Sequence, residues 1–397
     1  MHTQPPEPKD TSESAFLELA SVIEKHFYKP DIQAIRIVLG AIKAHYLRIG
    51  DPAWLFVVAP PGTGKTTVAI MGASGLPEVT MLSDFTENTF LSGFYQQKEA
   101  GLLERLGNTE VTGKRYDVTG NGIFLAKDFT TVLSMHREKR AKILAQLREI
   151  HDGMFKRDFG TGETKIWRGR VTIIAAVTPV LDRHSSIFST LGERFLQVRW
   201  HRPDSEEAGQ WAIRQQGHEE EIQRECTTAI RQLFEASLKS VPRLTEMCES
   251  RLAAVAELTA LGRTHAYRSS WGNRELEYIP EPEANTRIAK GLAALSRGIA
   301  ALHRREEVSE SEMQGAMRVA FDCIPDNRRK LLKIAIDGGE PGLAPIPRTV
   351  RDRALEELHG LGLLEQSPSN EDHWTLSERA RILLSAAGIE RFPICRG

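Results

Sequence analysis

The chain has 397 residues, of which 52 are basic, 53 acidic and 41% hydrophobic, and its formal net charge at pH 7 is −1. This balance is typical of an ordinary globular protein and excludes a uniformly basic nucleic-acid coat, so any nucleic-acid contact requires local basic patches. The length exceeds what one hydrophobic core usually organises, and we expect two or three domains.

The four cysteines show no paired spacing (Cys226, Cys248, Cys323 and Cys395). This pattern favours neither a zinc site nor a disulfide framework, and it fits the reducing cytoplasm, where we expect the protein to be located. Residues 1–14 are polar, rich in proline and acidic groups, and without an apolar signal segment, so we expect a disordered N-terminus. No later segment is apolar and long enough to span a bilayer, and we expect no membrane partner.

Between residues 15 and 50, apolar residues recur at helical spacing on both sides of Pro30-Asp31. The periodicity predicts two helices with a break between them. We expect these helices to form a small prelude to the main domain, which we place at residues 51–203.

A glycine-rich run, Ala59 to Thr66, follows the apolar segment Trp54–Val58 and precedes a helix-compatible stretch. Strand, glycine-rich loop and helix form the context of a phosphate-binding loop, although Ala59 stands where the consensus has its first glycine. In such a loop, backbone N–H groups hold a polyphosphate, the lysine reaches the terminal phosphates and the last hydroxyl ligates Mg²⁺. We therefore expect ATP and Mg²⁺ as cofactors, with Thr66 on the metal. The expected nucleotide contacts are Pro61, Gly62, Thr63, Gly64, Lys65, Thr66 and Thr67.

Two further strands are predicted over Val79–Leu82 and Gly122–Ala126, as in a parallel sheet. The stretch between them from Phe85 to Phe94 is rich in aromatic and hydroxyl side chains. It is equally compatible with a functional loop and with a segment packed on the sheet.

Lys127 and Asp128 follow the second of these strands. In phosphate-loop ATPases the strand beside the loop ends in an acid that holds Mg²⁺, often followed by an acid that orients the attacking water. Here Lys127 occupies the first position and Asp128 the second. Three interpretations remain open: the strand is one residue longer and Asp128 holds the metal; Asp128 orients water while Thr66 holds the metal; or hydrolysis is slow or absent. We favour retained hydrolysis.

Residues 135–150 predict a strongly basic amphipathic helix, and two short strands around Gly160-Thr161-Gly162-Glu163 predict a β-hairpin. Cations can bind phosphates and aromatic rings can stack on bases. The candidate nucleic-acid contacts in the hairpin are Lys156, Arg157, Lys165, Trp167 and Arg168. A hairpin packed for structure alone would show the same residues.

The next apolar strand, Val171–Val177, ends at Thr178, and Glu193-Arg194-Phe195 precedes another strand. A polar residue at the end of the central strand would lie beside the phosphate loop. Thr178 is therefore a candidate contact to the γ-phosphate or to water.

The phosphate loop, the Gly122–Phe129 segment, the hairpin, the Ala175–Pro179 segment and Glu193-Arg194-Phe195 together resemble the AAA+ ATPases. The similarity extends over about residues 54–323. It is greatest to the branch with a hairpin before the first sensor, which includes the minichromosome-maintenance replicative helicases. The resemblance implies that Thr178 is the first sensor, a position usually held by asparagine. It also implies that Arg194 is an arginine finger for a neighbouring subunit's nucleotide, and hence a hexameric ring or an open helical assembly of identical chains. The alternative role for Arg194 is a surface ion pair.

Residues 204–323 are predicted to be mostly helical, with an insertion containing Trp271 and Tyr278. The resemblance implies a AAA+ helical lid, with Arg287 at the second-sensor position. An arginine at a helix N-terminus opposes the helix dipole and so favours an anionic partner. An ordinary helix-terminal arginine is the alternative.

Residues 324–397 predict a separate unit with two helices, two short strands and a last helix, in the winged-helix order. The second helix resembles a recognition helix, and its candidate DNA contacts are Arg348, Arg351 and Arg353. Acidic residues in the wing, Glu371-Asp372, disfavour contact with a phosphate backbone there. Winged helices also dock proteins, so a protein partner is the alternative.

The predicted fold is an α/β phosphate-loop core of the AAA+ type with a parallel sheet, a helical lid and a C-terminal winged-helix domain. The leading hypothesis is an oligomeric ATPase that acts on DNA as a translocase, helicase or replication-type loader. Its catalytic residues would be Lys65, Thr66, Asp128, Thr178, Arg194 and Arg287. Lys127 motivates the alternative, a nucleotide-gated scaffold of a mobile-element or defence complex with slow or no hydrolysis. A protein remodeller is disfavoured because no aromatic pore loop is evident.

Overall fold

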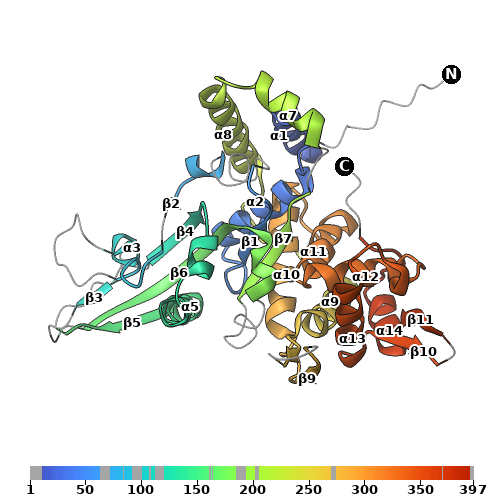
Figure 1. Ribbon diagram of the computed structural model, residues 1–397. Coiled ribbons are helices and arrows are strands. Elements are labelled where there is room, and N and C mark those ends of the chain that lie inside the picture. Colours follow the sequence, from blue (N-terminus) through green and yellow to red (C-terminus); the bar gives the residue numbers. More distant parts are fainter. Residues whose placement is uncertain are drawn as a thin grey trace, which may run out of the picture.

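The computed structural model describes residues 11–62, 72–83, 85–91, 101–106, 109–111, 120–160, 162, 164–184, 194–201, 205–269, 274–368 and 370–393. At its centre lies a sheet with the strand order β2–β4–β6–β1–β7, in which all neighbouring strands run parallel (Figure 1). These strands are β1 Trp54–Val58, β2 Val79–Leu82, β4 Gly120–Ala126, β6 Thr164–Val177 and β7 Phe195–Arg199. The predicted α/β class with a parallel sheet is confirmed.

β1 is the strand from which the glycine-rich loop leaves the sheet. All five of its residues are buried, because β6 and β7 flank it and helices cover the sheet, and this explains its uninterrupted apolar sequence. At its carboxyl end the Ala59 N–H donates to the Val177 carbonyl (3.0 Å) and the Trp200 N–H to the Val58 carbonyl (2.9 Å). The loop after β1 therefore begins between the ends of two neighbouring strands, where ligands of open α/β sheets commonly bind.

The strand that precedes Asp128 is not adjacent to β1. We expected that strand to lie beside the phosphate loop, and this expectation is wrong because β6 lies between β4 and β1. Ile174 of β6 pairs with Leu125 on one side and with Leu55 on the other. The placement of the strand that ends at Thr178 beside β1 is confirmed.

The predicted hairpin exists, but its second strand is the beginning of the 14-residue strand β6. β5, Met154–Asp158, pairs antiparallel with the first part of β6, and β3, Thr109–Val111, pairs with it from the other side. Figure 1 shows this arm projecting from the central sheet. Helix α5, Arg137–His151, packs along the arm, and α3, Leu102–Arg105, and α4, Thr130–Ser134, lie in the same half.

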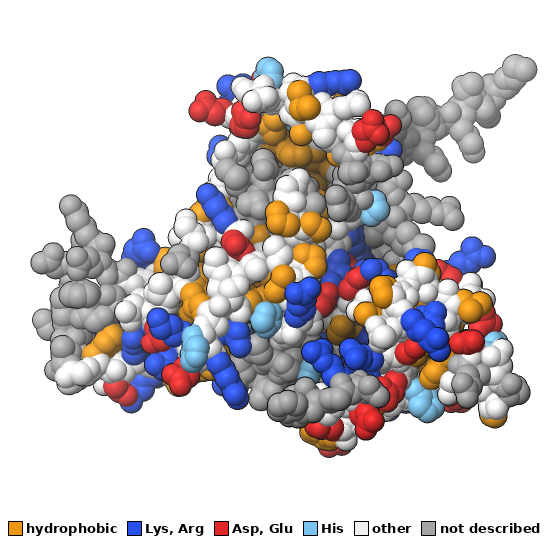
Figure 2. Space-filling model, viewed as in Figure 1, with side chains coloured by type: hydrophobic (Ala, Val, Ile, Leu, Met, Phe, Trp, Pro, Cys, Tyr) orange, Lys and Arg blue, Asp and Glu red, His pale blue; other side chains and the backbone are white. Residues whose placement is uncertain are grey.

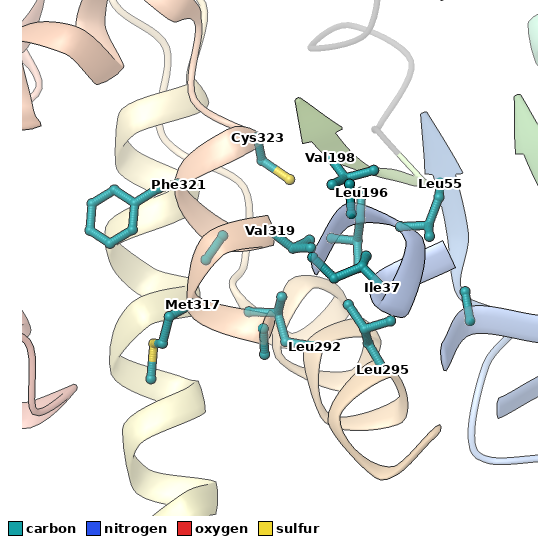
Figure 3. Close-up of a cluster of buried hydrophobic side chains, with 14 of the residues drawn as sticks. Ile37, Leu55, Leu196, Val198, Leu292, Leu295, Met317, Val319, Phe321 and Cys323 are labelled. Atoms are coloured by element: carbon teal, nitrogen blue, oxygen red, sulfur yellow. The ribbon is translucent and has the colours of Figure 1, made fainter. Parts of the chain in front are cut away.

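The two predicted N-terminal helices are confirmed as α1, Thr11–His26, and α2, Ile32–Tyr46. α2 contributes to the main hydrophobic core, since nine of the ten residues from Ile37 to Tyr46 are buried. Figure 3 shows Ile37 between sheet residues such as Leu55 and Val198 and residues of two later helices, Leu295 and Val319. α2 thus joins the sheet to the helical half.

The helical half contains α7 Ser205–Arg214, α8 Glu219–Ala236, α9 Glu246–Arg263, α10 Thr286–Leu302 and α11 Glu310–Asp322, with a small hairpin β8 Tyr267–Arg268 and β9 Leu276–Tyr278. α10 crosses α2 at a point where both helices carry glycine. A Cβ on Gly298 would lie 2.1 Å from the Gly40 carbonyl oxygen, so the two backbones are in direct contact. Short one-turn helices are η2 Gly72–Gly75, η4 Pro179–His184 and η5 Pro341–Leu343.

The C-terminal elements follow the predicted order: α12 Asp326–Ile336, α13 Arg348–Gly360, β10 Leu364–Ser367, β11 Asn370–Leu376 and α14 Glu378–Ala386. Their buried residues, such as Leu331 and Leu358, belong to the same hydrophobic cluster as α2 and α10, and α14 packs on α9. None of the helices within the described ranges combines the length and apolar character needed to cross a bilayer.

The helix crossing gives a test of this architecture. Gly298→Ala should lower the free energy of unfolding by about 1–3 kcal/mol, because the new methyl group collides with the backbone of α2. Gly209→Ala is the matched control in α7, where nothing lies within 4 Å of an added Cβ, and it should be neutral or stabilising. Denaturant unfolding measures both, and equal effects of the two substitutions would contradict the crossing.

Candidate functional site

The predicted phosphate loop begins at the carboxyl end of β1. Pro61 and Gly62 are exposed there, and Gly62 has a φ of +77° with open space around the position of a Cβ. Glycine adopts this left-handed conformation at little cost, which suits a loop that curves around a ligand. The other expected contacts, Thr63, Gly64, Lys65, Thr66 and Thr67, lie outside the described residues.

Asp128 and Thr178 are joined by hydrogen bonds through Thr130, at the same edge of the sheet as the loop. The Thr130 N–H donates to Asp128 Oδ1 (2.8 Å). The Thr130 hydroxyl accepts from the Thr178 N–H (3.1 Å) and donates to the Thr178 hydroxyl (3.4 Å). Sequence reasoning missed Thr130. The available signal was Asp128, because an aspartate often accepts a hydrogen bond from the N–H two residues later.

The position of Asp128 excludes one of the three interpretations of this residue, the one with a longer strand. β4 ends at Ala126, so the strand is not one residue longer than expected. Lys127 is exposed, while its N–H still donates to the Leu82 carbonyl of β2 (3.2 Å). Asp128 is also exposed, and the hydrogen bond to Thr130 engages only one oxygen of its carboxylate. The carboxylate can therefore face a ligand at this edge, although no group of metal-ligating side chains occurs among the described residues.

A network of ion pairs fixes the turn that follows Thr178. The Arg199 guanidinium at the end of β7 donates to both oxygens of Asp182 in η4 (2.9 and 2.7 Å) and to the Asp322 carbonyl of α11 (2.9 Å). Arg318 of α11 donates to both carboxylate oxygens of Asp31 (2.8 and 2.5 Å). The edge that carries the loop is thereby tied to α2 and α11.

Arg194 lies at the opposite edge of the sheet. It immediately precedes β7, whose first residue, Phe195, pairs with Trp54, the first residue of β1. At about 3.3 Å per residue, the five residues of β1 place Arg194 roughly 16 Å from the start of the predicted phosphate loop. Within one chain, Arg194 and the loop therefore belong to different surfaces.

The structure brings Arg194 and Arg287 together in one small pocket, and it adds Arg263. Arg194 donates to both oxygens of Asp152 (3.3 and 3.0 Å). Arg263 binds Glu283, and Arg287 Nη1 lies 3.8 Å from the other oxygen of the Glu283 carboxylate. Arg263 and Arg287 thus share the Glu283 carboxylate, and Arg194 binds Asp152. Arg263 was missed because a basic residue at the end of a helix is already explained by the helix dipole.

The protonation of neighbouring groups reflects this positive charge. Burial lowers the pKa of His151, and the nearby Arg194 lowers it further against the opposing effect of Asp152, so His151 is neutral at pH 7. Partial burial opposes ionisation of Asp152, but the hydrogen bonds from Arg194 outweigh it and lower the pKa of this carboxyl. His151 therefore adds no positive charge to the pocket.

Three of the five hairpin candidates are buried or bonded to other parts of the chain. Trp167 is fully buried, so the prediction that its ring stacks on a base is wrong. Lys165 is buried in an ion pair with Glu104, so a phosphate contact by Lys165 is also wrong. Arg157 donates to the carbonyls of Glu87 (2.6 Å) and Leu91 (3.0 Å), and Phe85 and Phe90 in the same segment are buried. The described part of the Phe85–Phe94 stretch is therefore packed on the sheet.

Lys156 and Arg168 lie on the other face of the arm. Strand alternation separates them from Trp167 and Lys165, and both side chains are exposed. Lys156 also has a 3.5 Å contact with Asp158. These two residues are the hairpin candidates that remain accessible to a nucleic acid.

The three candidate arginines of α13 differ in accessibility. The Arg348 side chain is 86% exposed, and that of Arg351 is 18% exposed. Both lie within 3.5 Å of Asp352, which offsets part of their charge. Arg353 is half-buried, and its carbonyl accepts from Arg268 of β8 (2.9 Å). α13 is consequently less basic at its surface than its sequence suggests.

No protein-family model matches this chain, and no curated protein matches it significantly.

The acid dependence of stability tests the network at the loop edge. Burial opposes ionisation of Asp31, but hydrogen bonds from Arg318, His201 and Ala34 outweigh it and lower the pKa of this carboxyl. Because the folded-state pKa lies below the unfolded value of about 3.9, the stabilisation is present above that pH and lost as the pH falls further.

Asp31→Asn should therefore cost about 3–5 kcal/mol at pH 7, since it leaves Arg318 buried without its carboxylate. The difference in unfolding free energy between wild type and variant should shrink below about pH 4. Arg381→Gln, at an exposed ion pair of α14, is the control with little effect. A difference that stays constant with pH would contradict this role of Asp31.

Proposed function

We propose that the protein is an oligomeric ATPase whose nucleotide site is shared between neighbouring chains, and that it acts on DNA. One observation carries the proposal. The phosphate loop leaves the carboxyl end of β1, whereas Arg194 and Arg287 lie together at its amino end. A head-to-tail contact between two copies would bring the loop of one chain to the arginines of the next, and such contacts generate rings or helical filaments.

The residues of the loop edge would bind and orient the nucleotide. Lys65 and the backbone of the loop would hold the triphosphate, and Thr66 with Asp128 would hold Mg²⁺. When bound, the metal neutralises charge on the terminal phosphates. The left-handed Gly62 and the exposed carboxylate of Asp128 fit this arrangement. Thr178, positioned by Thr130, would donate its hydroxyl hydrogen bond to the γ-phosphate or to the attacking water.

The arginine edge would complete the site of the neighbouring chain. Arg194, Arg263 and Arg287 line one pocket there, and Arg287 has only a long contact of 3.8 Å with Glu283, so Arg287 could turn to an anion. A terminal phosphate held by the neighbour's loop would be that anion. Arginines that neutralise a transferring phosphoryl group can be worth ~10³–10⁵ in rate.

The DNA part of the proposal rests on the arm. Figure 2 shows Lys and Arg side chains, interspersed with acidic ones, over the region of the arm and α5. The exposed cations there are Lys156 and Arg168 of the hairpin and Arg137, Lys139 and Lys142 of α5. Such a surface favours contact with phosphates rather than stacking on bases.

A nucleotide-gated scaffold is the second candidate, and Lys127 favours it. Its ammonium stands where an acid would hold the metal, which would slow hydrolysis without preventing nucleotide binding. The two candidates differ in turnover. Multiple-turnover hydrolysis that is lost in Asp128→Asn supports the ATPase, and nucleotide-dependent assembly without turnover supports the scaffold.

Mixing of inactive variants tests the shared site. Lys65→Ala and Arg194→Ala should each abolish most ATPase activity while assembly with an ATP analogue, measured as mass, is retained in Arg194→Ala. An equimolar mixture should recover about a quarter of the wild-type rate, because one interface in four then combines an intact loop with an intact arginine.

Arg214→Ala, at an exposed position of α7, is the control that should keep full activity. No recovery in the mixture, with both variants assembled, would refute a site shared between chains.

Charge reversal on the arm tests the DNA contact. Lys156→Glu with Arg168→Glu should weaken DNA binding and reduce the slope of log K against log salt by about two, one for each phosphate that the arm no longer neutralises. Arg214→Glu changes charge equally per residue on α7 and should leave the slope unchanged. An unaltered slope in the arm variant would place the DNA contact elsewhere.

A further inference from the structure

We propose that Arg263 is a positioning residue that keeps Arg287 available to an incoming phosphate by occupying the carboxylate of Glu283. This inference rests on the proposed function and extends it to a residue that does not itself need to touch the nucleotide. Arg263 and Arg287 both contact the carboxylate of Glu283, but Arg263 is buried and Arg287 is more exposed.

The pair between Arg263 and Glu283 is short and buried. Arg263 is the last residue of α9 and is only 8% exposed. Its Nε and Nη2 atoms lie 2.7 and 2.5 Å from the same oxygen, Oε1, of Glu283. Separating such a pair would leave a buried charge without its partner, which is costly. Glu283 is therefore firmly held by α9.

The pair between Arg287 and Glu283 is long and more exposed. Arg287 Nη1 is 3.8 Å from Oε2, and the Arg287 side chain is 41% exposed. Exposed ion pairs at this distance contribute little, so Arg287 can leave Glu283 at small cost. An arriving phosphate would then recruit Arg287 while Glu283 stays with Arg263.

The two contacts of Glu283 show what Arg263 adds. With Arg263 present, Oε1 of Glu283 is held by Arg263, and Arg287 faces only Oε2 at 3.8 Å. Without Arg263, both oxygens of Glu283 become available to Arg287. A phosphate would then have to displace a carboxylate.

The test is a double-variant cycle with ATPase kinetics and assembled mass as readouts. Arg263→Met, which keeps an apolar stem of similar length, should lower kcat by about tenfold. KM for ATP should change little, because the neighbour's loop holds most of the triphosphate. Adding Glu283→Gln to Arg263→Met removes the carboxylate that competes with the phosphate for Arg287 and should restore most of kcat. Arg263→Lys should retain an intermediate kcat, since it keeps the charge without the two-pronged contact.

The outcomes separate this inference from the proposed function. Wild-type kcat in Arg263→Met, or a double variant no more active than Arg263→Met, would overturn the positioning role. If Arg287→Ala and Lys65→Ala are impaired in the same series, the shared site survives that result. A wild type without ATPase activity, or an unimpaired Lys65→Ala, would overturn both. Thermal midpoints of all variants separate loss of fold from loss of activity.

Discussion

The carboxylate of Asp31 joins the sheet, the N-terminal helices and the helical half, and the rest of the structure depends on this junction. Its Oδ1 accepts from the Ala34 N–H and so caps α2, its Oδ2 accepts from the His201 N–H after β7, and both oxygens accept from Arg318 of α11. A carboxylate that is buried in this way needs all of these donors. Sheet, N-terminal helices and helical half are therefore joined at one point beside the loop edge, and the close α2–α10 crossing extends the same junction.

This junction restricts how the helical half can move relative to the sheet. Opening within one chain would break the Asp31–Arg318 pair, the contacts of Arg199 with Asp322, and the packing of Ile37 between two layers. Breaking one buried ion pair by itself costs about 3–5 kcal/mol. The arginine pocket, in contrast, contains a pair as weak as that of Arg287 with Glu283. Charge rearrangement at the edge of the molecule is thus far cheaper than rearrangement inside it.

The sequence predicts the sheet well because its strands are continuous apolar runs between glycine or charged residues. It predicts less about the hairpin, since strand alternation separates Lys156 and Arg168 from Lys165 and Trp167 but does not say which face is covered. The covering segment, with Phe85 and Phe90, comes from elsewhere in the chain. Likewise, the contact of Arg263 with Glu283 joins residues at the ends of different elements, which no local pattern indicates. The order of β4 and β6 in the sheet also depends on contacts between distant segments of the chain, which no local pattern indicates.

The separation of the loop from the arginines, however, follows from chain direction alone. In a parallel sheet, residues that follow strands gather at one edge and residues that precede strands gather at the other. Thr178 and Asp128 follow strands, whereas Arg194 precedes one. Arg194 can then bind a ligand only at its own edge of the sheet or in the site of another chain. Its partner Asp152 is 59% exposed, so solvent screens this carboxylate, while the Arg194 side chain itself is 12% exposed. A terminal phosphate carries more charge than this carboxylate, and it would therefore compete effectively for Arg194 once a second chain presents it.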